Sequence, residues 1–258
     1  MIELAFHHDS AVAQLTLNRP PANAFTPEGL DHLRECIGEL NKNIRVRAIV
    51  ITGNGPKFFS AGADLNQFAT GSKEAALRAA AAFGTAFEVL QNARPVVIAA
   101  VNGYAMGGGL ECALSCDIRI AEQQAQMALP EPGVGLLPAG CGTQTLPWLV
   151  GEGWAKRMIL TGERVTAETA LHIGLVEEVV EQGKSLEAAL AMAVRVLKNS
   201  PQATDFSKQL IHQARNGIPR SAALSVERER FVDLFSGPNQ REGTNAFLEK
   251  RVPVWKFE

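Results

Sequence analysis

The chain has 258 residues, of which 46% are hydrophobic and 20% are charged, and its formal net charge is −2. These values are typical of a soluble globular protein with one large domain, and the absence of a long basic run disfavours nucleic acid as a partner. The four cysteines, Cys36, Cys112, Cys116 and Cys141, match no zinc-binding spacing, and no basic segment typical of a secretory signal opens the sequence. We therefore expect a cytoplasmic protein without a metal site.

Strands and helices alternate in the first half of the chain. Thr26 followed by Pro27 is typical of a helix start, because a capping hydroxyl precedes a proline at the first helical position. The alternation favours an α/β fold with parallel strands, preceded by an N-terminal hairpin. The predicted elements are strands at residues 2–6, 11–17, 47–52, 96–101 and 118–121, and helices at about 27–43 and 73–92.

The second half changes character after Met127. Residues 127–147 are dense in glycine and proline, which indicates a loop or a broken helix. Helices are then predicted at about 153–161, 166–172, 185–199, 203–216, 220–236 and 239–250. We expect an α/β core over residues 1–195 and a helical region over residues 196–258.

The stretch at residues 96–117 combines a strand, a glycine turn and a helix. Gly107, Gly108 and Gly109 end the turn, and Glu111 lies in the first turn of the helix. Glycines allow the backbone to approach a ligand, and free N–H groups at a helix N-terminus suit an oxygen that gains negative charge. This predicts an active site, although the same pattern also fits a packing turn with a favourable helix dipole partner. Residues 95–110 carry no charge, but this run is too short to span a membrane.

Two further segments complete a possible constellation. Residues 59–65, with the sequence FSAGADL, form a loop of small residues after a predicted strand. Residues 129–138 place Glu131 between two prolines, and Pro132 biases it toward an extended backbone. Glu131 is therefore a second candidate carboxylate, although the pattern alone also fits an ordinary loop residue.

Taken together, these motifs resemble the enoyl-CoA hydratase/isomerase (crotonase) superfamily. The resemblance extends from NRPPANAF through AGADL, NGYAMGGGLE and the PE…GLLP…GTQ segment to FVDLFSGPNQREGTNAFLEKRVP. It implies an α/β fold of the ClpP-like type, a spiral of ββα units, with a helical C-terminal region over 196–258 that forms trimers. It also implies an enoyl-CoA hydratase, which adds water across the C2–C3 double bond of a 2-enoyl-CoA thioester to give 3-hydroxyacyl-CoA.

The resemblance also implies roles for particular residues. The backbone N–H groups of Ala63 and Gly108 would form an oxyanion hole for the thioester oxygen, and Glu111 and Glu131 would hold and activate the water. No cofactor is implied, because coenzyme A is part of the substrate. The residues implied to contact coenzyme A are Ala22, Ala24, Lys57, Ala61, Asp64, Leu65 and Lys250.

The implied partners are an acyl-CoA substrate and further copies of the chain, as a homotrimer or as a hexamer of two trimers, with neither nucleic acid nor membrane. Two alternatives stay open: a Δ3-Δ2-enoyl-CoA isomerase, which needs only one acid–base group, and a non-catalytic or RNA-binding homologue. Pro21 replaces a lysine that is common after NRP in the family. Pro132, Gly133 and Cys141 also depart from the usual pattern, which leaves the preferred acyl chain open.

Overall fold

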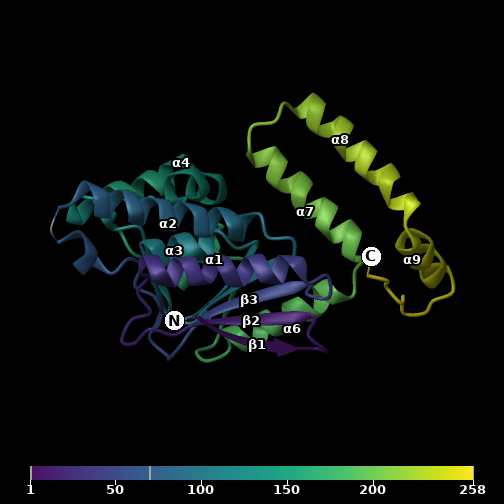
Figure 1. Cartoon of the computed structure of the whole chain (residues 1–258), viewed down its shortest axis with the longest axis horizontal. Coiled ribbons are helices and arrows are strands. Elements are labelled where there is room, and N and C mark those ends of the chain that lie inside the picture. The colour runs from purple at the N-terminus through teal and green to yellow at the C-terminus, as the bar shows by residue number, and fades with distance from the viewer. Residues whose placement is uncertain (1, 70, 258) are drawn as a thin grey trace.

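The computed structural model describes residues 2–69 and 71–257 and shows two sheets covered by helices (Figure 1). The larger sheet has the strand order β1-β2-β3-β5-β7-β10, in which β1 is antiparallel to β2 and the other neighbours are parallel. Its strands are β1 (Ile2–His7), β2 (Val12–Leu17), β3 (Ala48–Gly53), β5 (Val96–Val101), β7 (Ile118–Glu122) and β10 (Glu178–Val180). The predicted hairpin and the predicted parallel α/β architecture are therefore confirmed.

A smaller sheet runs beside the larger one in the order β4-β6-β8-β9. Its strands are β4 (Phe58–Ser60), β6 (Tyr104–Met106), β8 (Gln126–Ala128) and β9 (Val165–Thr166). A long strand, a short strand and a helix follow one another three times along the chain: β3-β4-α2, β5-β6-α3 and β7-β8-α4. This succession is the expected spiral of ββα units, and it brings the ends of β4, β6 and β8 together.

The helices of the core bury their apolar residues against these sheets. In α1, for example, Leu30, Leu33 and Ile37 recur at helical spacing and are fully buried. The side chain of Thr26 accepts a hydrogen bond from the N–H of Gly29, as predicted for a capping residue. The core helices are α1 (Pro27–Lys42), α2 (Lys73–Gln91), α3 (Gly108–Leu114), α4 (Gly142–Thr161), α5 (Ala167–His172) and α6 (Ser185–Leu197).

Helix α4 begins much earlier than the sequence predicted. The glycine- and proline-rich segment at 127–147 was expected to be loop or broken helix, but its last residues already form the first turns of α4. The helix breaks at Gly151, where φ is 77°, outside the segment in which an irregularity was expected. Gly162 then ends the helix in the left-handed conformation.

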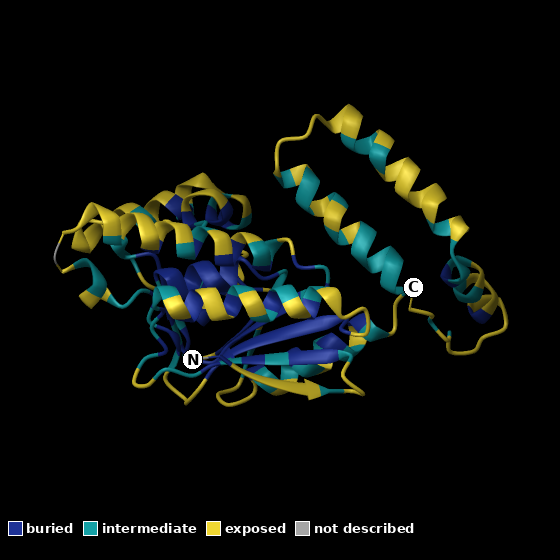
Figure 2. Cartoon of the chain, in the orientation of Figure 1, coloured by how far each residue is buried: buried dark blue, intermediate teal, exposed yellow. Residues whose placement is uncertain are grey.

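The last three helices, α7 (Pro201–Arg215), α8 (Arg220–Asp233) and α9 (Pro238–Leu248), lie to one side of the core (Figure 1). Helices α7 and α8 form a hairpin, and much of α8 is exposed (Figure 2). Large apolar side chains of this region face solvent, among them Phe231, Phe235, Phe247, Val252 and Val254. Among the helices in the described ranges, none has the length and apolarity needed to span a bilayer.

Candidate active site

The N-terminus of α3 is packed so tightly that it requires glycine. Gly107 has φ of 53° and ψ of −127°, and a Cβ built on it would lie 3.0 Å from Oε1 of Glu131. A Cβ on Gly109 would collide with the backbone oxygen of Ser60. The turn therefore holds Glu131 and the loop after β4 directly against the start of α3, which only residues without a Cβ permit.

The backbone N–H of Ala63 points away from the segment around Phe25, with which Ala63 pairs. Phe25 donates to the oxygen of Gly62 at 2.7 Å and accepts from the N–H of Asp64 at 2.9 Å, which makes a parallel bridge between Phe25 and Ala63. In such a bridge the flanking residues face the partner, so the N–H of Ala63 faces the opposite side. A Cβ on Gly62 would lie 3.0 Å from the nitrogen of Gly108, which places this loop beside the helix start.

Neither of these two N–H groups donates a hydrogen bond to another part of the described chain. Gly108 is the first residue of α3, so its N–H has no partner one turn earlier in the helix. Two unused donors, of Ala63 and Gly108, thus stand at the positive end of a helix dipole. Such an arrangement can stabilise an oxygen that becomes an anion.

The carboxylate of Glu111 is buried and held by three consecutive backbone N–H groups. Its Oε1 accepts from Gly140 at 2.9 Å, from Cys141 at 2.8 Å and from Gly142 at 2.8 Å. Burial raises the pKa of Glu111 above its usual value, and the three hydrogen bonds, which favour the charged form, offset only part of this increase. We call residues 140–142 the carboxylate clamp. The clamp occupies Oε1 and leaves Oε2 for a ligand.

Glu131 is also shielded from solvent, but no such set of donors holds it among the described residues. It is half-buried in the 3₁₀ turn η2 (Glu131–Val134), and its Oε2 is shielded from solvent without a hydrogen-bond partner in the described chain. Burial, reinforced by the nearby carboxylate of Glu111, raises the pKa of Glu131 to about 7. The site therefore contains two carboxyl groups with raised pKa values, of which Glu111 is held by three N–H donors.

The comparisons with known proteins agree with this geometry. The model of the family described as enoyl-CoA hydratase/isomerase matches residues 7–258. The chain belongs to the enoyl-CoA hydratase/isomerase family. It is 40% identical to a short-chain-enoyl-CoA hydratase of Clostridium acetobutylicum over 248 residues, which cover 94% of this chain and 93% of that protein. It is also 38% identical to a crotonyl-CoA hydratase of Syntrophomonas wolfei, over 94% of both chains.

Solved structures show the same similarity. The structure of DspI from Pseudomonas aeruginosa is 59% identical in sequence, with a TM-score of 0.96 over 99% of this chain and 96% of that one. The crystal structure of an enoyl-CoA hydratase from Bacillus anthracis is 34% identical, with a TM-score of 0.95 over 100% of this chain and 99% of that one. The crotonase fold expected for this family is thereby established.

Several residues that the family resemblance connects with coenzyme A lie in one loop cluster. The N–H of Ala61 donates to the oxygen of Ala22 at 2.9 Å, and Asp64 caps the 3₁₀ turn η1 (Leu65–Phe68). Arg19 joins this cluster, since its guanidinium contacts Asp64 at 2.6 Å and the oxygen of Ala24 at 3.3 Å. Hydrogen bonds from the Arg19 guanidinium and from the next turn lower the pKa of Asp64.

The two predicted lysines are placed differently. Lys57 lies 5.4 Å from the centroid of the Phe58 ring and lines a separate cavity of about 560 Å³ with Tyr104 and Gln124. Lys250 follows α9 with φ of 55°, and it is exposed. No hydrogen bond or ion pair among the described residues links Lys250 to Glu111 in the same chain.

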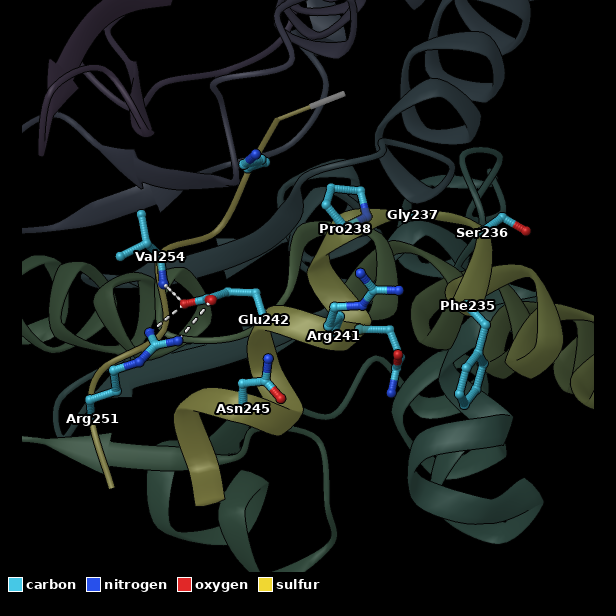
Figure 3. A pocket seen from close by; sticks show the side chains of 11 residues that line it. Phe235, Ser236, Gly237, Pro238, Arg241, Glu242, Asn245, Arg251 and Val254 are labelled. Carbon is cyan, nitrogen blue, oxygen red and sulfur yellow. Dashed lines mark hydrogen bonds and ion pairs between the residues drawn. The ribbon is translucent and has the colours of Figure 1, made fainter. Parts of the chain in front are cut away.

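The C-terminal region has a cavity of its own, of about 680 Å³ (Figure 3). Arg251 pairs there with Glu242 at 2.6 Å, and the N–H of Val254 donates to the same carboxylate at 2.8 Å. None of its lining residues belongs to the constellation around Glu111. Its polar contacts tie the chain after α9 back onto that helix.

Sequence reasoning missed three parts of the site. The clamp was missed because its donors are backbone groups, and only the short GCG sequence at 140–142 could have indicated it. Arg19 lies 45 positions from Asp64, so their pairing has no local signature. Phe83 and Phe87 of α2 border Gly108 and Gly140, although the sequence predicted only a helix there.

Proposed function

We propose that this chain is an enoyl-CoA hydratase, which adds water across the C2–C3 double bond of a 2-enoyl-CoA thioester to give 3-hydroxyacyl-CoA. The observation that carries the proposal is the pair of unlike carboxylates beside two unused N–H donors. Hydration needs both a base for water and an acid for the α-carbon.

Glu111 is the base in this proposal. Three N–H groups hold its Oε1 and stabilise the carboxylate, so the free Oε2 can accept a proton from a water molecule as the oxygen attacks C3. Glu131 is the acid, because its raised pKa keeps it protonated for a large share of the time near neutral pH. The proton leaves Glu131 for C2, and the pair ends the reaction with the same total number of protons as it began.

The N–H groups of Ala63 and Gly108 act on the thioester oxygen. Attack at C3 moves an electron pair toward that oxygen and gives an enolate, whose charge is largest near the transition state. One preorganised donor of this kind is worth about 10²–10³-fold in rate. Because both donors are fixed by neighbouring glycines and by the bridge to Phe25, they need no rearrangement during the reaction.

The proposal is tested by following the loss of the conjugated enoyl-thioester absorbance with crotonyl-CoA and longer 2-enoyl-CoA substrates. A hydratase gives 3-hydroxyacyl-CoA as the product in mass spectrometry. Conversion of 3-enoyl-CoA to 2-enoyl-CoA without water addition would instead identify an isomerase. No turnover of either thioester, with retention of an RNA ligand, would favour the non-catalytic homologue.

We expect the pH dependence of kcat/KM to fall at high pH. Glu131 has a pKa of about 7, so above this pH the pair loses its only proton, and the rate should drop about tenfold per pH unit. Hydration and dehydration both require Glu111 and Glu131 to share one proton. The rates of both directions should therefore fall over the same high-pH range, and the midpoint of this fall is an apparent pKa of the two carboxyl groups together. The measurement is initial rates from pH 5 to 10. A flat profile up to pH 9 would contradict the assignment.

The substrate is proposed to bind along the loop cluster of Ala22, Ala24, Ala61, Asp64 and Leu65. Coenzyme A belongs to the substrate, and we propose no further cofactor. Lys57 and Lys250 are proposed to approach its phosphates, the latter from a neighbouring copy. We further propose that residues 1–195 are the catalytic core and 196–258 the oligomerisation region, in a cytoplasmic protein without nucleic acid or membrane partners. The four cysteines are free thiols, as a reducing compartment favours.

We expect the protein to form trimers, alone or paired into hexamers. The C-terminal region exposes Phe231 at 62%, Phe247 at 83% and Val252 at 83%, and exposed apolar side chains that gather in one region are typical of protein interfaces. Burying these side chains between copies would also bring Lys250 to another copy's site. Sedimentation velocity at micromolar concentration should show a trimer or hexamer. A single monomer peak would contradict both the assembly and the role of Lys250.

A further inference from the structure

The direction of the Ala63 N–H is set by one hydrogen bond on the other side of its peptide group. In the planar trans peptide between Gly62 and Ala63, the carbonyl and the N–H point in opposite directions. The oxygen of Gly62 accepts a hydrogen bond from the N–H of Phe25 at 2.7 Å. The N–H of Ala63 is therefore aimed away from Phe25, toward the space in front of α3.

The hydrogen-bonded chain continues through a second peptide group to a charged side chain. The N–H that binds Gly62 belongs to the peptide between Ala24 and Phe25. The carbonyl oxygen of that peptide, on Ala24, accepts from Nη1 of Arg19 at 3.3 Å. Two peptide groups are thus aligned head to tail between the Arg19 guanidinium and the N–H of Ala63. Hydrogen bonds in such a chain polarise one another, and an arginine at its head is always charged.

Arg19 is held at the head of this chain by its side chain and by its backbone. Its Nη2 contacts Oδ2 of Asp64 at 2.6 Å, which leaves Nη1 for the carbonyl of Ala24. Its backbone N–H donates to Oδ1 of Asn23 at 3.2 Å, and its oxygen accepts from the N–H of Asn23 at 2.8 Å. Asn23 is 2% exposed, and its side-chain amide donates to two carbonyls of β4. The guanidinium is therefore fixed relative to the loop that follows β4.

We propose that Arg19 is a positioning residue of the oxyanion hole, which orients and polarises the N–H of Ala63 through the two peptide groups. The inference rests on the proposed hydratase function and adds a residue that does not touch the reacting atoms. One oxyanion-hole donor is worth about 10²–10³-fold in rate, and each hydrogen bond of a chain strengthens the next by about 10–30%. Over two links, loss of the charge should lower kcat by about three- to thirtyfold.

The same cation could instead contact a phosphate of coenzyme A, because Ala24 and Asp64 belong to the loop cluster proposed to bind the substrate. The two roles differ in their kinetics. The charge on the thioester oxygen is largest near the transition state, so a polarised donor acts on kcat and leaves KM nearly unchanged. A phosphate contact is equally strong before and during the reaction, so its loss raises KM alone.

The first experiment measures crotonyl-CoA hydration by Arg19→Gln and Arg19→Met, two variants without the charge, and by Arg19→Lys, which retains it. Both uncharged variants should lose about three- to thirtyfold in kcat, and Arg19→Lys should lose less than either. The matched control is Arg157→Gln, since Arg157 also forms a partly exposed ion pair, with Glu163 at 2.8 Å. It should leave kcat as in the wild type. An unchanged kcat in the uncharged variants, or a loss confined to KM, would overturn the proposal.

The second experiment follows the infrared carbonyl stretch of bound hexanoyl-CoA, labelled with a heavy carbon isotope at C1, and needs no turnover. In the wild type this band should lie at lower frequency than in the free thioester, because two N–H donors polarise the carbonyl. Arg19→Gln and Arg19→Met should lose part of this shift, whereas Arg157→Gln should retain all of it. A merely structural role for Arg19 would lower the melting temperature and leave the band of the folded variants unmoved, which would contradict the proposal.

The two experiments also separate this inference from the hydratase function. If the band responds to Arg19 but crotonyl-CoA is not hydrated, the hydratase function fails while the polarised donor is supported. If crotonyl-CoA is hydrated and the band ignores Arg19, the function holds and the inference is wrong. Failure of hexanoyl-CoA to bind, without hydration of crotonyl-CoA, would overturn both.

Discussion

Replacing either Glu111 or Glu131 by glutamine should lower kcat for crotonyl-CoA hydration by at least about 10²-fold, the usual contribution of a general acid or base. Glutamine keeps the shape of the side chain but cannot transfer the proton. Because the two carboxylates act on one water and one proton, the double variant should cost little more than the worse single change. Steady-state kinetics of the three variants measures this directly.

A suitable control is Glu122→Gln, since Glu122 is also a buried glutamate, 3% exposed, but its carboxylate caps α6 through Ser185. This change should lower thermal stability and leave kcat of the folded protein close to the wild-type value. Hydration that stays within tenfold in either Glu111→Gln or Glu131→Gln would refute the two-carboxylate mechanism. An isomerase would show one dominant residue and one nearly silent residue.

Gly62→Ala should lower kcat by about 10²–10³-fold, the cost of a lost oxyanion-hole donor. Gly62 has φ of 87°, and a Cβ there would lie 2.5 Å from the oxygen of Met106 and 3.0 Å from the nitrogen of Gly108. The methyl group would push the loop away from α3, and this would separate the N–H groups of Ala63 and Gly108. Both donors would then lose the position in which they meet one oxygen.

Backbone strain alone must be separated from this loss. Gly183→Ala introduces alanine at φ of 80° with no atom within 4 Å of its Cβ, so it carries a similar strain, of order 1–3 kcal/mol, without a collision. Both variants should melt at lower temperature than the wild type. Only Gly62→Ala should lose activity while it is folded, as judged by circular dichroism. Equal kcat values for the two variants would show that the loop does not position the oxyanion hole.

The long elements could be predicted from the sequence because each has either a helical periodicity or a continuous apolar run bounded by turn residues. Strands β2, β3 and β5 and helices α1, α2 and α6 were all expected close to their observed bounds. The smaller sheet was not, since β4, β6 and β8 have three residues each and β9 has two, too few for alternation to be recognised. The start of α4 was missed because Pro147 and the neighbouring glycines signal a loop.

The candidate site also has features that the sequence predicted and features that it did not. Glu111 and Glu131 were found because their side chains stand in distinctive settings, three glycines in one case and two prolines in the other. What holds these carboxylates, and what surrounds them, is contributed by backbone groups and by rings 24 to 31 positions away in sequence, such as Phe87 and Cys141 relative to Glu111. Contacts of this kind follow from the tertiary fold and leave no mark in the local sequence.

The carboxylate clamp has an evolutionary consequence. At Cys141 the group that holds Glu111 is an amide, which every amino acid except proline supplies, so the side chain at this position can drift without loss of the clamp. The flanking positions have no such latitude, because a side chain on Gly140 would meet Phe87 and one on Gly142 would meet Leu129. Position 141 at the centre of the clamp therefore tolerates substitution, whereas Gly140 and Gly142 at its ends do not. This explains how a cysteine that is unusual for the family can stand between two glycines that the packing requires.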